Sequence, residues 1–306
     1  MNATQPTGRI LASAPRLVID ANNYLGETPV WSREENALYW INVENPPTLS
    51  RWDFVSGARR DWPMRERIGG FVLKENGGAV LVLASGVFDF DFDSGALILR
   101  AKSPLPPHIS LHECQCDRDG RLWVGAINHR LRETPEPPGG GMLFRLDADE
   151  LVPEVSGISC ANGLAFSPAG DRLYLTDSPL RRVESWALDR RNGKLSDRRE
   201  FFTVGRGEGF VDGATVDSAG CYWATLVYGS AIRCYRADGT LAARVPLPFG
   251  NPTKVAFGGP EMRTLFITTC KLTPRSGEPD PAAALLGGVF ALDLDVAGIP
   301  DTLFAG

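Results

Sequence analysis

Short runs of apolar residues alternate with tight polar turns along most of the chain. Each unit is an apolar strand, a turn containing Gly, Asp, Asn or Pro, and a second apolar strand, which is the pattern of a β-hairpin. Six units are found, at Pro29–Trp40, Phe71–Leu83, Cys114–Gly125, Leu164–Ser178, Ala214–Leu226 and Val255–Cys270. Their turns, at Glu34, Asn76, Asp119, Ala169, Ala219 and Pro260, follow one another at intervals of 42, 43, 50, 50 and 41 residues. A strand-rich repeat of about 40–50 residues predicts the blades of a propeller.

Further apolar strands follow several of the hairpins, so each blade is expected to hold about four strands. These strands are Leu143–Asp147, Val183–Asp189, Ala231–Asp238 and Val289–Asp293. The N-terminal run Arg16–Asp20 is in position to complete the last blade and close the ring. Helical periodicity is nearly absent. The sequence therefore predicts an all-β, six-bladed β-propeller over residues 16–306 as a single domain, with residues 1–15 as an N-terminal tail and with Arg132–Gly141 and Thr273–Pro281 as loops inside blades.

Composition and charge narrow the function classes. The 33 Gly and 23 Pro residues stand beside 43% hydrophobic residues, which indicates many turns in a globular protein and not disorder. A net charge of −5 does not indicate the basic surface that binding to nucleic acid or to an anionic membrane requires. No apolar run approaches the roughly 20 residues of a membrane span, and we expect no secretory signal. The six cysteines are too sparse for a disulfide scaffold and contain no CxxC pair, so we expect buried free thiols in a reducing, cytoplasmic protein.

The repeat also aligns one polar position per blade at the centre of the ring. Seven residues before each turn stand Glu27, Gly69, His112, Asn162, Asp212 and Thr253. Polar residues at strand starts can simply cap turns or line a solvated channel. Closely spaced carboxylates, however, repel one another unless a proton or a cation lies between them. An oxygen-dominated set favours Ca²⁺, Mg²⁺ or Mn²⁺, whereas a ligand from His112 would favour Zn²⁺ or Fe²⁺.

Several segments resemble the SMP-30/gluconolactonase/LRE-like family, which includes regucalcin and bacterial sugar lactonases. The segments are LGETPVWSREENALYWINV, CDRDGRLWVGA, ANGLAFSPAGDRLYLTDS, VDGATVDSAGCYWATL and PTKVAFGG, and the similarity covers about residues 20–295. The resemblance implies that Glu27, Asn162 and Asp212 hold one divalent metal ion, with calcium as the first expectation and zinc, manganese, magnesium or iron as alternatives.

Two segments depart from the family pattern where substrate is expected. Family lactonases usually carry RxNDG before the DxxGRxW segment, and this chain has Ser110, His112 and Glu113 at the positions of the Arg, the Asn and the Asp. A later loop, where regucalcin-like members place a substrate-binding Glu, contains His129 and Arg130. We therefore expect Ser110, His112, His129 and Arg130 to contact a differently decorated sugar lactone, for instance an acidic one that pairs with Arg130. The alternative interpretation, which the sequence supports equally, is that His129 and Arg130 are ordinary loop residues without a role in substrate binding.

The expected reaction is hydrolysis of a small-molecule aldono- or uronolactone to the free acid. The metal would act as a Lewis acid on the carbonyl, with Asp212 as the general base for water and His112 as the competing candidate. No GxSxG, HExxH, Walker A or GxGxxG motif is present, which disfavours a covalent serine mechanism and nucleotide binding. The alternatives are a metal-dependent esterase or organophosphate hydrolase on the same site, or a non-catalytic calcium-binding propeller.

Overall fold

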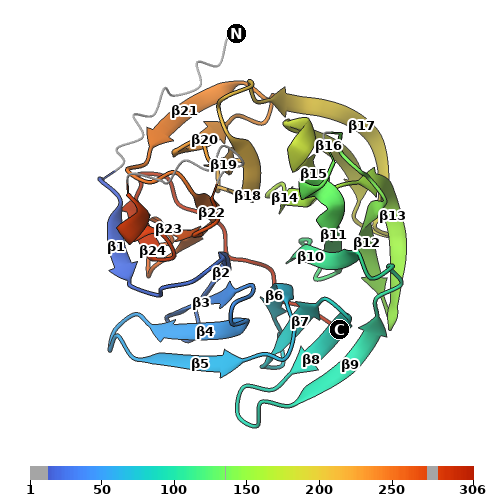
Figure 1. Ribbon diagram of the computed structural model, residues 1–306, viewed down its shortest axis with the longest axis horizontal. Coiled ribbons are helices and arrows are strands. Elements are labelled where there is room, and N and C mark those ends of the chain that lie inside the picture. Colours follow the sequence, from blue (N-terminus) through green and yellow to red (C-terminus); the bar gives the residue numbers. More distant parts are fainter. Residues whose placement is uncertain (1–12, 135, 274–281) are drawn as a thin grey trace.

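Six four-stranded antiparallel sheets surround a central channel (Figure 1). The computed structural model describes residues 13–134, 136–273 and 282–306, and these contain 24 strands and three short 3₁₀ helices. The prediction of an all-β, six-bladed propeller is confirmed. Most of the expected N-terminal tail, residues 1–12, and residues 274–281 of the expected Thr273–Pro281 loop lie outside the described residues.

In five blades the strands run outward from the channel in chain order. Blade 1 contains β2 (Gly26–Ser32), β3 (Ala37–Asn42), β4 (Thr48–Asp53) and β5 (Arg59–Pro63), and blade 2 contains β6 (Ile68–Leu73), β7 (Ala79–Leu83), β8 (Gly86–Phe90) and β9 (Leu97–Lys102). Blade 3 contains β10 (Ile109–Cys116), β11 (Leu122–Asn128), β12 (Gly141–Asp147) and β13 (Glu150–Ile158). Blade 4 contains β14 (Ala161–Phe166), β15 (Arg172–Asp177), β16 (Arg182–Asp189) and β17 (Lys194–Thr203). Blade 5 contains β18 (Phe210–Val216), β19 (Tyr222–Val227), β20 (Ala231–Tyr235) and β21 (Leu241–Pro246).

The sixth blade joins the two ends of the chain. It contains β22 (Pro252–Gly258), β23 (Thr264–Thr269), β24 (Val289–Asp293) and, outermost, β1 (Arg16–Ile19). Strand β1 pairs antiparallel with β24, with Arg16 opposite Ala291, so the expected closure of the ring by the N-terminal strand is confirmed. The helices are η1 (His129–Arg132), η2 (Ser178–Leu180) and η3 (Ala283–Leu285). Within the described parts of the chain, none of the helices has the length and apolar character that crossing a membrane requires.

The hairpin turns next to the channel are held by side chains that recur in the sequence. In blade 3, Asp117 accepts hydrogen bonds from the backbone N–H of Asp119 and from the indole Nε1 of Trp123, at 2.9 and 3.0 Å. In blade 5, Asp217 accepts from the indole of Trp223 at 2.8 Å in the same way. Both tryptophans are fully buried. The carboxylate thus closes the turn and satisfies the one polar atom of a large core side chain, which fixes the inner hairpin against its neighbour.

All six innermost strands have an irregularity in their pairing at the same level of the channel. The pairing shifts after Glu27, Ile68, Leu111, Asn162, Val211 and Pro252. A bulge re-aims the side chains beside it and ends regular pairing locally. The residues that the repeat aligns, Glu27 to Thr253, lie at this level, so the fold turns one position per blade into a ring around the channel.

Candidate active site

The ring of aligned residues is polar on five of the six blades, and four of these, all but Thr253 on β22, carry groups that can bind a metal ion. Glu27 lies on β2, His112 on β10, Asn162 on β14 and Asp212 on β18, and Glu27, His112 and Asn162 are buried. The position on β6 is Gly69, where an added Cβ would come within 2.6 Å of the His112 backbone oxygen. The absence of a side chain there lets the backbone of β10, with His112, approach β6 closely.

Two of the ring side chains are carboxylates that influence each other. The Glu27 carboxylate accepts a hydrogen bond from the backbone N–H of Thr28 at 2.9 Å, whereas no hydrogen bond holds the Asp212 carboxylate within the described part of the chain. Burial raises the pKa of Glu27, and Lys254 opposes that rise. Burial, followed by the charges of Glu27 and Glu113, raises the pKa of Asp212 well above its usual range. Two desolvated carboxylates at one site are the arrangement that a divalent cation stabilises, so the donor set fits the metal that the sequence predicts.

A buried ion pair lies beside these carboxylates. Lys254 on β22 donates to the Glu113 carboxylate at 2.7 Å, and the two side chains are only 7% and 5% exposed. The other Glu113 oxygen accepts from the backbone N–H of Leu164 at 2.9 Å. Gly213 makes room for the lysine, since a Cβ there would lie 2.3 Å from the Lys254 side chain. Glu113 is therefore committed to Lys254 and to blade 4, which leaves Glu27 and Asp212 as the carboxylates available to a cation.

Asn162 is oriented by its neighbours on blades 4 and 5. Its amide nitrogen donates to the Ser178 hydroxyl at 2.9 Å, and that hydroxyl donates to the backbone oxygen of Val211 at 2.7 Å. With the amide nitrogen held in this way, the amide oxygen is the atom left to accept a hydrogen bond from the His112 ring and to act as a ligand. Ser178 is thus a supporting residue that positions Asn162.

His112 lies between Asn162 and an arginine of the next blade. Its Nδ1 is 3.5 Å from a terminal nitrogen of Arg67, and the Asn162 side chain hydrogen-bonds to the ring. Burial first, and then the charges of Arg67 and Lys254, hold the pKa of His112 well below its usual range. The imidazole is therefore neutral at pH 7, and a guanidinium facing Nδ1 favours the tautomer with the proton on Nε2.

The remaining predicted contact residues are arranged in two groups. Ser110 is buried on β10, and its hydroxyl is 2.8 Å from Nε2 of His129, the first residue of η1. Arg130 is exposed on the same helix, and no hydrogen bond or ion pair of its guanidinium to the channel is found among the described residues. The structure thus places Ser110 and His129 together at the channel end that holds the ring, and leaves Arg130 at its outer edge.

Arg67 and Lys254 lie at the site but were not among the residues that the sequence predicted there. Lys254 carries a signal, because it is a single lysine inside the otherwise apolar strand segment PTKVAFGG and directly follows the aligned Thr253. Arg67 precedes β6 in a loop that also contains Arg65 and Glu66, so nothing in its neighbourhood distinguishes it from a surface residue.

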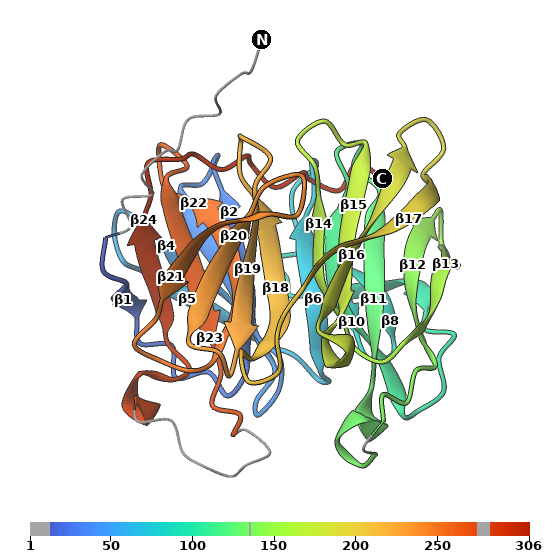
Figure 2. The same cartoon turned by 90° about the horizontal axis from the view of Figure 1, so that it is seen from above.

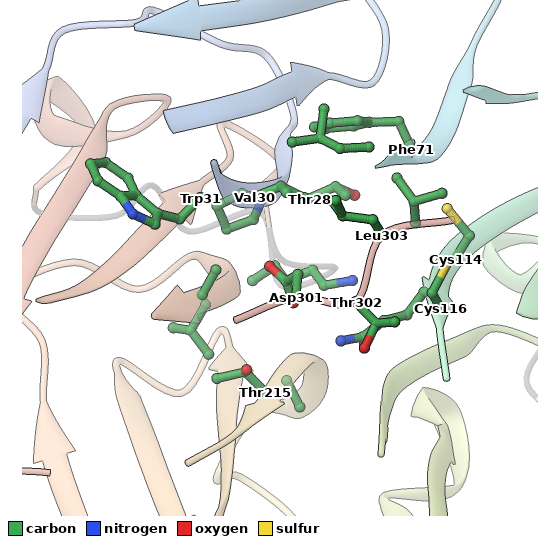
Figure 3. Close-up of a pocket in the computed structure, with 18 residues that line it drawn as sticks. Thr28, Val30, Trp31, Phe71, Cys114, Cys116, Thr215, Asp301, Thr302 and Leu303 are labelled. Atoms are coloured by element: carbon green, nitrogen blue, oxygen red, sulfur yellow. The ribbon is translucent and has the colours of Figure 1, made fainter. Parts of the chain in front are cut away.

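The other end of the channel is closed by the C-terminal segment. At the far end of blade 5 the backbone N–H of Ser218 donates to the oxygen of Ala297, and at the far end of blade 2 the oxygen of Leu73 accepts from the N–H of Phe304. The segment therefore crosses the channel (Figure 2). Beneath it is a cavity of about 40 Å³ lined by the later halves of the inner strands and by Asp301, Thr302 and Leu303 (Figure 3). Because one end is sealed, a substrate can reach the ring only from the end where η1 lies.

A second group of metal-ligand types lies away from the channel axis. Ligand atoms of Asp217, Cys221 and Cys234 on blade 5 lie within 4.8 Å of one another. The Asp217 carboxylate, however, already accepts hydrogen bonds from Ala219, Cys221 and Trp223. The six cysteines, all within the described residues, form no disulfide, and five of them are buried.

Comparison with known proteins gives one consistent result. The SMP-30/Gluconolactonase/LRE-like region profile matches residues 25–271. The chain is 34% identical to a 6-deoxy-6-sulfogluconolactonase of Pseudomonas putida over 95% of this chain and 98% of that protein. It is 33% identical to a pentonolactonase of Haloferax volcanii, over 93% and 96% of the two chains. The crystal structure of a calcium-binding protein, regucalcin, from Agrobacterium tumefaciens superposes with a TM-score of 0.87 at 23% identity, covering 96% of this chain and 98% of that one.

Proposed function

Because the chain belongs to the SMP-30/gluconolactonase/LRE-like family, we propose that it is a divalent-metal-dependent lactonase that hydrolyses the cyclic ester of a sugar lactone to the free acid. The observation that carries the proposal is the pair of desolvated carboxylates, Glu27 and Asp212, beside the oriented amide of Asn162 at the open end of the channel. Relatives that match nearly the full length are named as a 6-deoxy-6-sulfogluconolactonase, a pentonolactonase and an L-arabinolactonase. A location in a reducing compartment such as the cytoplasm is part of the proposal.

Glu27, Asn162 and Asp212 would hold the metal, and calcium is the first expectation because all three offer oxygen. When bound, a divalent ion polarises the carbonyl oxygen of the ester and stabilises the negative charge that develops there. The protein contributes a fixed donor set. Thr28 and Ser178 orient Glu27 and Asn162, and the Glu113–Lys254 pair keeps a third carboxylate away from the ion.

Asp212 is the proposed general base for the attacking water. Its carboxylate has no hydrogen-bonding partner within the described residues, so its oxygens are free to accept a proton. His112 is the weaker candidate, because Arg67 faces Nδ1 and Asn162 hydrogen-bonds to the ring, which leaves no lone pair directed at water. We therefore assign His112 to substrate contact, together with Ser110 and His129.

A non-catalytic calcium-binding propeller is the second candidate function. It is favoured by the superposition on a regucalcin described as a calcium-binding protein. Both functions need the same three ligands, so metal binding alone does not separate them.

The test combines metal analysis with a substrate screen. Protein purified without added metal is analysed for bound elements, loaded with Ca²⁺, Zn²⁺, Mn²⁺ or Mg²⁺, and assayed by pH-stat titration on a panel of aldono- and uronolactones. We expect metal-dependent acid release that is lost in Asp212→Asn. Full activity of Asp212→Asn after chelation and metal resupply would show that the assigned site is wrong. Metal binding without hydrolysis of any lactone would favour the calcium-binding function.

A further inference from the structure

Arg67 is a cation that reaches the open end of the channel from blade 2. It lies directly before β6, in the loop that follows β5, and its side chain is only 15% exposed. One terminal nitrogen is 3.5 Å from Nδ1 of His112. The charge of Arg67 also acts on the pKa values of Glu27, His112 and His129, which places the guanidinium among the residues of the proposed site.

The guanidinium has unused hydrogen-bonding capacity. Of its five N–H donors, one pairs with Glu44 at 3.0 Å and another faces His112 at the long distance of 3.5 Å. Nε is buried and has no hydrogen-bond partner among the described residues. Burying arginine N–H groups without acceptors costs free energy, and a bound ligand that accepts hydrogen bonds from them removes this cost.

Arg67 and Lys254 are paired with their carboxylates very differently. Lys254 is locked to Glu113, and both side chains are almost completely buried. The partner of Arg67, Glu44, is 38% exposed, so water competes for its carboxylate and the pair is weak. Arg67 can therefore exchange Glu44 for another anion, whereas Lys254 cannot exchange Glu113.

The neighbours of Arg67 at this end offer little competing charge. The blade 3 side chains near it are His112, whose Nδ1 is 3.5 Å away, and His129, whose Nε2 is 2.8 Å from the Ser110 hydroxyl. Besides Glu44, the carboxylate on which the charge of Arg67 acts is that of Glu27 in the proposed metal site, where a divalent ion would neutralise it. If a divalent ion neutralised that charge, the Arg67 guanidinium would be a positive group at a fixed place beside the proposed metal site.

We propose that Arg67 binds an anionic group carried by the substrate on the side remote from the lactone carbonyl, so that the enzyme is selective for anionic sugar lactones. The planar guanidinium suits a carboxylate, a sulfonate or a phosphate, which it contacts through two parallel hydrogen bonds. The proposal rests on the proposed lactonase function and adds a specificity residue to it. Glu44 is the internal competitor, because its carboxylate occupies Arg67 when no anionic substrate is bound.

The test compares lactones that differ only at the remote carbon. A six-carbon aldonolactone with a neutral hydroxymethyl end is compared with the analogues that carry a carboxylate or a sulfonate there. We expect the metal-loaded wild type to prefer the two anionic lactones. Arg67→Gln should lower kcat/KM on them by about 10- to 100-fold, mainly through KM, while its kcat/KM on the neutral lactone changes less than about threefold. Glu44→Gln should lower KM for the anionic lactones, because the competing carboxylate is gone.

Arg65→Gln is the matched control, since Arg65 is an exposed arginine of the same loop and the substitution removes the same charge. It should leave all three values of kcat/KM unchanged. Equal loss on neutral and anionic lactones in Arg67→Gln, or a wild type without preference, would overturn the proposal. A selective loss in Arg130→Gln with normal kinetics in Arg67→Gln would also overturn it, and would identify Arg130 as the anion-binding residue.

A binding measurement separates this proposal from the lactonase function. If the wild type hydrolyses no lactone, the proposed function fails, and calorimetry with the open-chain diacid and monoacid still tests Arg67. Tighter binding of the diacid that disappears in Arg67→Gln would support an anion site. Equal dissociation constants in the wild type and the variant would exclude it.

Discussion

The two ends of the central channel are built from the same six strands and differ in every property that matters for chemistry. At the open end the inner strands begin with pairing irregularities that direct Glu27, His112, Asn162 and Asp212 toward the channel, with Lys254 paired to Glu113 beside them. At the closed end the strands continue with mostly apolar side chains, and the C-terminal segment covers them and adds the carboxylate of Asp301. The blade repeat supplies the frame of both ends, whereas the local departures from it decide which end is reactive.

The largest expected effect is the difference in activity between two variants, one with a carboxylate replaced at the open end and one with a carboxylate replaced at the closed end. Glu27→Gln and Asp301→Asn both replace a carboxylate with an amide in the channel. Glu27→Gln should lower kcat by roughly 10³-fold and abolish metal retention, because it removes a charged ligand from the proposed metal site. Asp301→Asn should keep both within about twofold. The measurements are kcat on the best lactone of the panel and metal content by elemental analysis.

A loss of activity in both variants would mean that the two ends are coupled through Lys254, whose charge acts on Glu27 and on Asp301 alike. Full activity in Glu27→Gln would show that the active site does not lie at the open end of the channel.

The closed end should instead matter for stability. Phe304 is 7% exposed, belongs to the same hydrophobic cluster as Val72, Cys116 and Leu122, and has the Arg100 guanidinium 5.2 Å from its ring centre. Phe304→Ala should therefore lower the free energy of unfolding by about 3 kcal/mol, as for other buried phenylalanines, while kcat at 25 °C stays unchanged. Urea unfolding and an initial-rate assay on the same preparation measure both quantities.

The neighbouring residue gives the control for that prediction. Leu303 is 36% exposed, so Leu303→Ala should lower the free energy of unfolding by less than about 1 kcal/mol. A kcat that falls together with stability in Phe304→Ala would show that the segment also shapes the open end.

The repeat made the fold and the ring of aligned residues predictable from the sequence. Hairpin turns at a nearly constant interval give both the blade count and the position that each blade presents to the channel, so Glu27 and Asp212 follow from spacing alone. The outermost strands were harder to place. Strand β17, for example, is mostly exposed and polar, because it lies at the edge of its sheet and buries little apolar surface.

The charged residues that surround the ring could not be predicted from the spacing of the hairpin repeats. Arg67 and His112 are 45 residues apart and belong to different blades, and Lys254 and Glu113 are 141 residues apart. Such pairs depend on which side chain fits between two blades, as when Gly213 leaves space for Lys254. The roles of Glu27, Asn162, Asp212 and Arg130 as metal or substrate ligands stay predictions that the experiments above decide.

The smallest expected effect concerns how the closed end responds to pH. Burial raises the pKa of Asp301 above its ordinary value of 3.8, although Arg118 and Lys254 oppose the rise. The folded state therefore holds this proton more tightly than the unfolded state, and the resulting stability is complete below pH 3.8 and is lost as the pH rises through the folded pKa. Asparagine imitates the protonated side chain at every pH. Asp301→Asn should thus have a Tm about 1–3 °C above that of the wild type at pH 7, and the difference should vanish in acid. Thermal unfolding of both proteins from pH 3.5 to 8 measures this, and a wild type that is more stable than Asp301→Asn at pH 7 would mean that Arg118 and Lys254 outweigh the burial of the carboxylate.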